Sequence, residues 1–220
     1  MNVLDVNFLR NEKALFVTGT DTGIGKTHVS CALLQALRGA GLTVQGMKPV
    51  ASGCVWVEGA WQNDDALALQ QAAASEQPYA LINPYALPLA TAPQVAAAKS
   101  GTELALEPMT EAFRTLSAHA DTVLVEGVGG WLAPLSDTLD QADLVHALDI
   151  PVLLVVGMRL GCINHARLSA LAIEASGCRL LGWVGNNVEP DFDAEGDYFA
   201  ALQRVMPSPC LGVVAYGNDL

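Results

Sequence analysis

A glycine-rich stretch near the amino terminus contains the residue types that hold phosphate groups. It runs from Gly19 to Thr27 and reads GTDTGIGKT. Glycines let consecutive backbone N–H groups turn toward phosphate oxygens, and the start of a following helix adds partial positive charge. The lysine would reach the outer phosphates, and the last threonine would ligate Mg²⁺. We therefore expect a phosphate-binding loop whose nucleotide-contacting residues are Gly23, Ile24, Gly25, Lys26, Thr27 and His28.

The loop departs from the usual spacing of this motif in one place. A glycine normally precedes Gly25 by five residues, whereas this chain has Thr20 there and Gly19 one residue earlier. The spacing predicts a lengthened loop, typical of a subset of nucleotide-binding proteins. The alternative interpretation is a surface turn that contains a lysine by chance.

Two acidic residues are candidate protein ligands for Mg²⁺, which takes one or two carboxylates when it is bound to a nucleotide. Glu126 follows the apolar run 122–125, and Asp65 opens a predicted helix. The alternative for both is an acid that caps a turn or a helix, and Asp64 would cap that helix equally well. The predicted metal ligands are Thr27, Asp65 and Glu126, and the predicted nucleotide contacts after the strand are Gly127, Val128 and Gly129.

Lys48 stands at the end of a second apolar run, 43–47, and is followed by Pro49. A lysine that points from a strand end into a ligand crevice would contact the same phosphates as Lys26. We therefore expect both lysines to be catalytic. The alternative for Lys48 is a solvated surface side chain, which is what most lysines are.

Alternating strand and helix patterns supply a scaffold for these residues. Apolar runs predict strands at 14–18, 43–47, 122–125, 152–156, 180–184 and 211–214. Helical spacing predicts helices at 28–37, 64–74, 110–120, 138–148, 164–175 and 198–205, and a short helix near 95–98 within a Pro- and Ala-rich excursion over 77–102. Parallel strands need crossovers, so the expected fold is α/β in three layers, a mostly parallel sheet with helices on both faces, of the P-loop NTPase type. Its ligand site should lie at the carboxyl ends of the strands.

Composition excludes several classes of protein. The 220 residues are 51% hydrophobic, which excludes a disordered, collagenous or coiled-coil chain. A net charge of −12 disfavours nucleic acid and anionic membranes as partners, and no apolar run approaches the roughly 20 residues of a membrane helix. The start shows no secretory leader, and the five cysteines are scattered. We expect a cytoplasmic protein with reduced thiols and one domain over 1–220, in which residues 1–12 pack on the surface or fray.

Several segments together resemble the pattern of the dethiobiotin synthetases. They are, in chain order, the loop at 19–27, KPVASG at 48–53, DALAL at 65–69, VEGVGGW at 125–131 and LGCINH at 160–165. The match covers nearly the whole chain and is far more specific than the loop alone. It implies an ATP-dependent ring closure in biotin biosynthesis, in which 7,8-diaminononanoate and CO2 become dethiobiotin with release of ADP and phosphate. It also aligns Asp65, not Asp64, with the family's acid.

The resemblance further implies how the substrate is held. Ser52 would bind the carbamate or amine end, and a helix start contributed by a second subunit would bind the carboxylate tail, which suits a helix N-terminus. Tyr198 matches a tyrosine near that tail, although a core residue is the alternative. The implied substrate-binding residues are Ser52, Gly161, Cys162, Ile163, Asn164 and Tyr198. A shared site implies a homodimer, with ATP and Mg²⁺ as cofactors.

The adenine end matches the family only in part. Asn186 and Asn187 fall on the family's adenine-reading position, where an amide can both donate to and accept from the base edge. Many family members have Ile-Pro after the last strand, where this chain has Val214 and Ala215. Ala215 is the residue expected beside the base on that side.

Two other classes of protein share parts of this pattern. Partition-type ATPases have the same fold and bind a macromolecular partner, but they carry a second lysine four residues before Gly25, where this chain has Asp21. A related amidoligase would need a glutaminase domain, for which the chain is too short. The synthetase remains the preferred hypothesis, and the nucleotide switch is the alternative.

Overall fold

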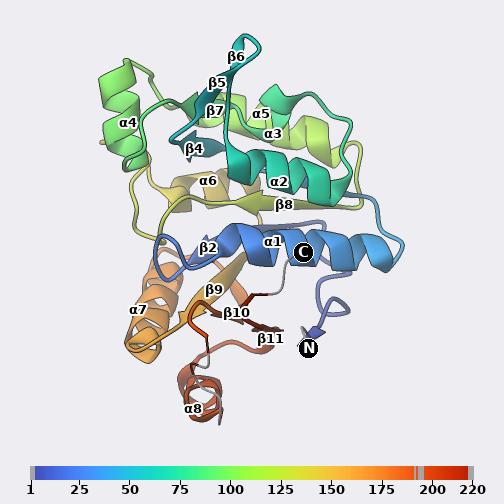
Figure 1. The fold of residues 1–220 in the computed structure, drawn as a ribbon, viewed down its shortest axis with the longest axis vertical. Coiled ribbons are helices and arrows are strands. Elements are labelled where there is room, and N and C mark those ends of the chain that lie inside the picture. The colour runs from blue at the N-terminus through green and yellow to red at the C-terminus, as the bar shows by residue number, and fades with distance from the viewer. Residues whose placement is uncertain (1–2, 191, 193–195, 218–220) are drawn as a thin grey trace.

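A seven-stranded sheet forms the centre of the computed structural model, which describes residues 3–190, 192 and 196–217 (Figure 1). From one edge to the other its strands are β1 (Val3–Leu4), β11 (Cys210–Val214), β10 (Leu180–Asn187), β9 (Val152–Met158), β2 (Ala14–Gly19), β8 (Thr122–Glu126) and β3 (Val44–Met47). All neighbours are parallel except β1, which pairs antiparallel with β11. The sheet is therefore mostly parallel, as the sequence predicts.

Helices cover both faces of this sheet and bury two separate apolar cores. One core lies beneath α1 (Lys26–Gly39) and α2 (Asp64–Ala73). The other lies beneath α5 (Leu106–Ser117), α6 (Gln141–Leu148), α7 (Cys162–Ala175) and α8 (Asp197–Val205). The central strands contribute side chains to both cores, because successive side chains of a strand point to opposite faces. In β2, Phe16 enters one core while Leu15 and Val17 enter the other. The predicted three-layer α/β fold is confirmed.

The six predicted strands are all present, and the excursion over 77–102 contains more structure than expected. It holds α3 (Tyr79–Ile82), β7 (Tyr85–Leu87) and α4 (Pro93–Ser100), of which only α4 was predicted. Strand β7 pairs with β4 (Val50–Ser52) in a separate two-stranded sheet. Elements of three or four residues leave too short a pattern to be recognised by periodicity.

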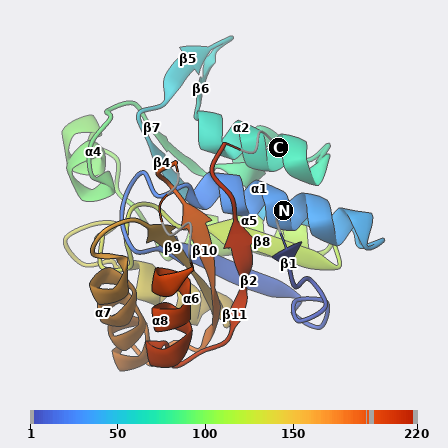
Figure 2. The ribbon, with the colours of Figure 1, turned by 60° about the horizontal axis from the view of Figure 1, so that its bottom comes forward.

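A hairpin of β5 (Val55–Val57) and β6 (Ala60–Gln62) projects from the body of the molecule (Figure 2). Trp56 and Trp61 pack edge to face across it, with ring centroids 5.3 Å apart. Both side chains are largely exposed, at 58% for Trp56 and 38% for Trp61. Trp131 and Trp183, by contrast, are buried.

The residues before the first central strand lie along the edge of the sheet. Strand β1 extends the sheet beyond β11, and the side chain of Leu9 is fully buried. Asp5 also donates its backbone N–H to Leu211 at 2.8 Å. Met1 and Asn2 lie outside the described residues. Within the described residues, no helix is long and apolar enough to cross a membrane.

Gly46 offers a direct test of how tightly the helices pack on the sheet. A Cβ at this position would come within 2.9 Å of the Cβ of Leu69 and 3.2 Å of Leu34 Cδ1. We expect Gly46→Ala to lower the free energy of unfolding by about 1–3 kcal/mol through overpacking. The matched control is Gly39→Ala, where a Cβ meets nothing within 4 Å and helix propensity favours alanine. Urea unfolding of both variants checks this, and equal stabilities would contradict close packing of α1 and α2 on Gly46.

Candidate active site

The glycine-rich loop connects β2 to α1, as predicted, and its glycines adopt conformations that other residues rarely take. Gly23 and Gly25 have φ values of 72° and 77°, and helix α1 begins at Lys26 directly after the second. The first backbone N–H groups of α1 therefore face the loop without a side-chain cap. This arrangement can surround a phosphate group with N–H donors.

The extra length of the loop is attached to strand β9. Thr20 donates its backbone N–H to the carbonyl of Val155 at 3.0 Å, and its Oγ1 accepts from the N–H of Gly157 at 3.3 Å. Asp21 next to it forms a 2.5 Å ion pair with Arg159, just beyond β9. The residue that replaces the usual glycine thus fixes the loop to the neighbouring strand.

The floor of the loop is held by Asn186, at the end of β10. Its Nδ2 donates to the carbonyl of Ile24 at 2.8 Å, and it would overlap any Cβ at Gly25. Asn186 is thereby buried beneath the loop, whereas Asn187 beside it is half-buried. The structure places the first of the two predicted adenine contacts against the phosphate loop.

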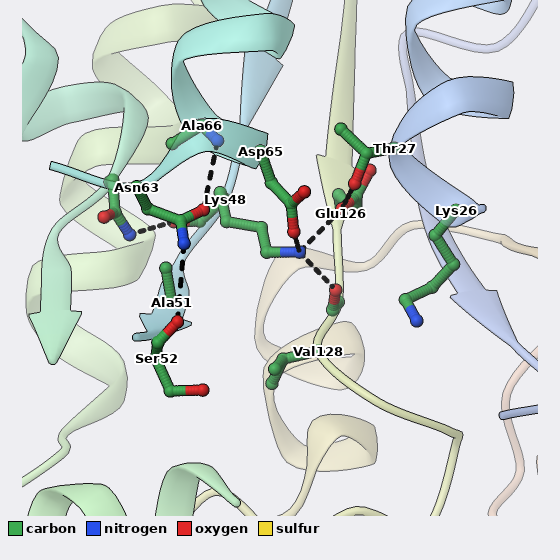
Figure 3. A network of polar contacts seen from close by, with 12 residues as sticks. Lys26, Thr27, Lys48, Ala51, Ser52, Asn63, Asp65, Ala66, Glu126 and Val128 are labelled. Atoms are coloured by element: carbon green, nitrogen blue, oxygen red, sulfur yellow. Dashed lines mark hydrogen bonds and ion pairs between the residues drawn. The ribbon is translucent and has the colours of Figure 1, made fainter. Parts of the chain in front are cut away.

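Lys48 lies at the centre of a cluster of charged groups formed where β2, β3 and β8 end (Figure 3). Its Nζ contacts Glu126 Oε1 at 2.6 Å and Asp65 Oδ2 at 3.1 Å, and donates to the Gly127 carbonyl at 3.2 Å. Thr27 Oγ1 donates to the same Glu126 oxygen at 2.8 Å. Lys48 is 3% exposed and Glu126 is 0% exposed, so Lys48 is not a solvated surface lysine.

The protonation of this cluster follows from burial and charge together. Burial alone would lower the pKa of Lys48, but Glu126 and Asp65 outweigh it and raise that pKa above its usual value. Burial would likewise raise the pKa of Asp65, but Lys48, Thr27 and Lys26 hold it below the usual range. Lys48 is therefore an ammonium and Asp65 a carboxylate near neutral pH.

Lys26 is in a different electrostatic situation, although it is also buried. Its Nζ donates to the Asp21 carbonyl at 3.3 Å and forms none of the ion pairs identified among the described residues. Burial and the nearby charge of Lys48 lower its pKa from 10.5 to about 8. A nucleotide would supply the negative charge that this ammonium lacks.

The residues beside Thr27 fit a magnesium ion in donor chemistry. Glu126 Oε2 is buried and has no hydrogen-bond partner among the described residues. Together with the Thr27 hydroxyl and the Asp65 carboxylate, it makes a set of hard oxygen donors, which Mg²⁺ prefers. The described residues contain no group of three or more His, Cys, Asp or Glu side chains suited to a metal. Mg²⁺ bound to a nucleotide takes its other ligands from phosphate and water.

The alternative interpretation of Asp65 as a helix cap does not fit the geometry. Asn63 is the N-cap of α2, and its Oδ1 accepts from the N–H of Ala66 at 3.3 Å. Asp64 is exposed, whereas Asp65 turns toward Lys48. Asn63 also donates to the Ser52 carbonyl at 3.4 Å, which links the helix start to β4.

A pocket of about 440 Å³ opens over this cluster. Nine of its ten lining residues were predicted to bind nucleotide, metal or substrate, and Thr22 was missed as a ligand contact although it lies in the motif. Another hollow, of about 620 Å³, lies at the opposite ends of the strands and includes Lys13 and Arg179 but none of the predicted residues. The pocket over the loop is lined by Thr22, Gly23, Gly25, Lys26, Thr27, Lys48, Ser52, Asp65, Val128 and Gly129.

The other predicted residues do not line this pocket. Gly161, with φ 92°, is the N-cap of α7, and Cys162 behind it is buried while Ile163 is half-buried and Asn164 is exposed. Tyr198 in α8 is half-buried and packs against Phe192, with ring centroids 4.7 Å apart. The pocket and the start of α7 are thus separate features of a single chain. The remaining residues outside the lining are Ile24, His28, Glu126, Gly127, Asn186, Asn187 and Ala215.

Sequence reasoning missed Arg159, although a signal for it was present. It follows the apolar run of β9 directly, at the end of the sheet where the other site residues gather. Asn63 was missed because its position before the two acids suggests only a cap. Its second contact, with Ser52, arises from the fold.

Known proteins resemble this chain over most of its length. A family model described as an AAA domain matches residues 13–220. The ATP-dependent dethiobiotin synthetase BioD of Xanthomonas oryzae pv. oryzae is 56% identical over 94% of this chain and 92% of its own length. The protein of the same name from Xylella fastidiosa is 57% identical over 90% of this chain and 88% of its own length.

Solved structures of P-loop proteins share the fold at low sequence identity. The MinD cell division protein of Aquifex aeolicus matches with a TM-score of 0.57 and 15% identity, over 92% of this chain and 82% of its own. The signal recognition particle receptor FtsY of Elizabethkingia anophelis matches with a TM-score of 0.52 and 16% identity, over 91% of this chain and 56% of its own. The fold is that of the P-loop NTPases, and the sequence relatives show that the chain belongs to the family of ATP-dependent dethiobiotin synthetases.

Proposed function

We propose that this ATP-dependent ligase of biotin biosynthesis closes the cyclic urea of dethiobiotin from 7,8-diaminononanoate, CO2 and ATP. The observation that carries the proposal is the buried Lys48 ammonium, held between Glu126 and Asp65 beside a phosphate loop. Cations placed where charge develops on a transferring phosphoryl group are the main requirement of such chemistry.

The proposed reaction has three steps. One substrate amine attacks CO2, forms a C–N bond and loses a proton to give a carbamate. A carbamate oxygen then attacks the γ-phosphorus of ATP while the bond to ADP breaks, which gives a carbamic-phosphoric anhydride. The second amine attacks the carbonyl carbon, the C–O bond to phosphate breaks, and the ring closes with release of phosphate. No covalent bond to the enzyme is needed.

The residues of the pocket would have different roles in this reaction. Lys26 and Lys48 would contact the phosphates, and the N–H groups around Gly25 would hold them in place. Thr27, Asp65 and Glu126 would hold Mg²⁺, which when bound neutralises phosphate charge. Lys48 Nζ already has three oxygen partners, so its direction is fixed before substrate arrives. Preorganisation of this kind lowers the cost of reaching the transition state.

The proposed substrate site extends from Ser52, which lines the pocket, to a second copy of the chain. The start of α7, with Asn164 exposed, would bind the carboxylate tail in the partner's site, with Tyr198 nearby. Three large apolar side chains on and beside this helix support a homodimer, because Leu160, Leu168 and Leu171 are all exposed.

The remaining parts of the proposal concern the base and the compartment. Asn187 and Ala215 would lie beside the adenine, while Asn186 would reach it with its carbonyl oxygen, since its amide nitrogen holds Ile24. All five cysteines lie within the described residues and are thiols rather than disulfides, and four of them are buried, which suits the reducing cytoplasm.

Reconstitution of the reaction tests the proposed function directly. Pure protein with ATP, Mg²⁺, bicarbonate and 7,8-diaminononanoate should form dethiobiotin and release ADP, as measured by mass spectrometry and a phosphate assay. Omission of the diamine should abolish both products, because the carbamate is the phosphoryl acceptor. ATP hydrolysis that proceeds without the diamine and responds to DNA or lipid would instead favour a nucleotide switch.

Substitution of Lys48 tests its catalytic role. Lys48→Ala should lower kcat by about 10²–10³-fold and change KM for ATP much less, because the ammonium serves mainly the transition state. Lys99→Ala, at an exposed position in α4, is the matched control and should keep full activity. Rates are to be compared at equal folded fraction, since the change leaves two carboxylates without their cation. Near-wild-type turnover of the Lys48 variant would remove this residue from the mechanism.

The lowered pKa of Lys26 predicts how nucleotide affinity depends on pH. With a pKa of about 8, the side chain of the free protein is charged below that pH and becomes neutral as the pH rises. The triphosphate favours the charged form, so ATP should bind with uptake of a proton above about pH 8. Its affinity should fall up to about tenfold for each pH unit above the pKa. Titration calorimetry in two buffers of different ionisation enthalpy measures both effects, and an affinity unchanged up to about pH 9.5 would contradict the assignment.

A further inference from the structure

Gln141 is a buried amide that holds the loop after β8. It is the first residue of α6 and is 1% exposed. Its Oε1 accepts from the N–H of Val128 at 3.1 Å. Its Nε2 carries two N–H groups, which are shared among three backbone carbonyl oxygens within hydrogen-bond distance, those of Gly130 at 2.7 Å, Trp131 at 3.2 Å and Ala133 at 3.4 Å. One neutral side chain thus makes four contacts with the backbone that follows Glu126.

These partners leave only one orientation for the amide. Three carbonyl oxygens surround one end of it and an N–H group faces the other, so a flipped amide would lose every contact. Gly127 makes room for it, because a Cβ at that position would overlap Gln141 Oε1 and the ring of Phe16. The start of α6 is itself fixed, since Asp140 donates its backbone N–H to Asp143 Oδ2 at 2.8 Å.

The Gly127–Val128 peptide is held at both ends by side chains. Its carbonyl oxygen accepts from Lys48 Nζ at 3.2 Å, and its N–H donates to Gln141 Oε1 at 3.1 Å. A peptide unit is planar, so fixing the direction of its N–H also fixes the direction of its carbonyl. Gln141 therefore sets the position of one of the three oxygens that surround the Lys48 ammonium, without touching Lys48 itself.

We propose that Gln141 is a positioning residue for phosphoryl transfer, which acts by orienting the Gly127–Val128 peptide against Lys48. This inference rests on the proposed function, in which Lys48 stabilises the transferring phosphoryl group. The same contact holds Val128 and Gly129 where they line the pocket. Residues of this kind, one contact removed from the reacting groups, typically change activity by about 10–100-fold when they are replaced.

The test compares two glutamines that differ in what they hold. Gln141→Met keeps the length of the side chain and removes its four contacts. Gln70→Met is the matched control, because Gln70 donates to a single carbonyl, that of Gln77, at 2.9 Å and lies outside the pocket. At equal folded fraction, Gln141→Met should lower kcat by about 10–100-fold with KM for ATP within about threefold, and Gln70→Met should leave both unchanged.

A conservative variant separates positioning from a general loss of stability. In Gln141→Glu, burial favours the neutral acid, which can accept from Val128 and donate to Gly130. Its kcat should lie within about threefold of the wild-type value, and this variant also serves if the methionine variant does not fold. Equal losses in the two variants, or a loss of ATP affinity without a loss of kcat, would overturn the proposal.

A readout independent of catalysis separates this proposal from the proposed function. Hydrogen exchange at the Val128 amide should be at least about tenfold faster in Gln141→Met than in the wild type, and unchanged in Gln70→Met. If the wild type forms no dethiobiotin, the proposed function fails, while the exchange result still reports whether Gln141 holds this peptide. Unchanged exchange would overturn the positioning role in either case.

Discussion

The site depends on the burial of one ammonium between two carboxylates. A buried lysine is stable as a cation only if opposite charge and hydrogen bonds replace the water it loses. Glu126, Asp65 and the Gly127 carbonyl do this for Lys48. With Lys26 nearby, the four charged groups of the cluster sum to zero. A triphosphate would add negative charge to this balance, and in the proposed chemistry a divalent cation and the Lys26 ammonium would offset it.

The order of the strands creates this cluster. In the sheet, β8 lies between β2 and β3, and the three strands are parallel. Val17 of β2 is opposite Glu126, and Met47 of β3 is opposite Val125, so the three strands end at nearly the same level. The phosphate loop follows β2, Lys48 follows β3, and Glu126 is the last residue of β8. Asp65 arrives from a different direction, at the first turn of α2, whose start Asn63 ties to β4.

Whether a contact in the site could be predicted depends on whether a local sequence pattern indicates the positions of both residues. Lys48 and Glu126 could be found because each stands at the end of an apolar run, and parallel strands must end together. The fold followed from the same alternation of strands and helices. Arg159 meets Asp21 across 138 residues, and no local pattern indicates which charges will pair over such a span. The exposed tryptophans could not be placed either, because a hydrophobic residue in a short hairpin has the same sequence pattern as one in a core.

The residues that support the site differ in charge according to their depth. The two buried ones are neutral: Asn186 holds the phosphate loop and Gln141 holds the loop after β8. A neutral amide fixes the backbone without disturbing a cluster whose charges would have to rebalance on binding of a nucleotide. The ion pair of Asp21 with Arg159 lies at the rim, where both side chains are partly exposed and water screens their field. Because the buried supporting residues are neutral and the charged pair lies at the rim, the loops are held in place without an added charge near Lys48. The electrostatics of the charged cluster remain those of the two lysines and two carboxylates.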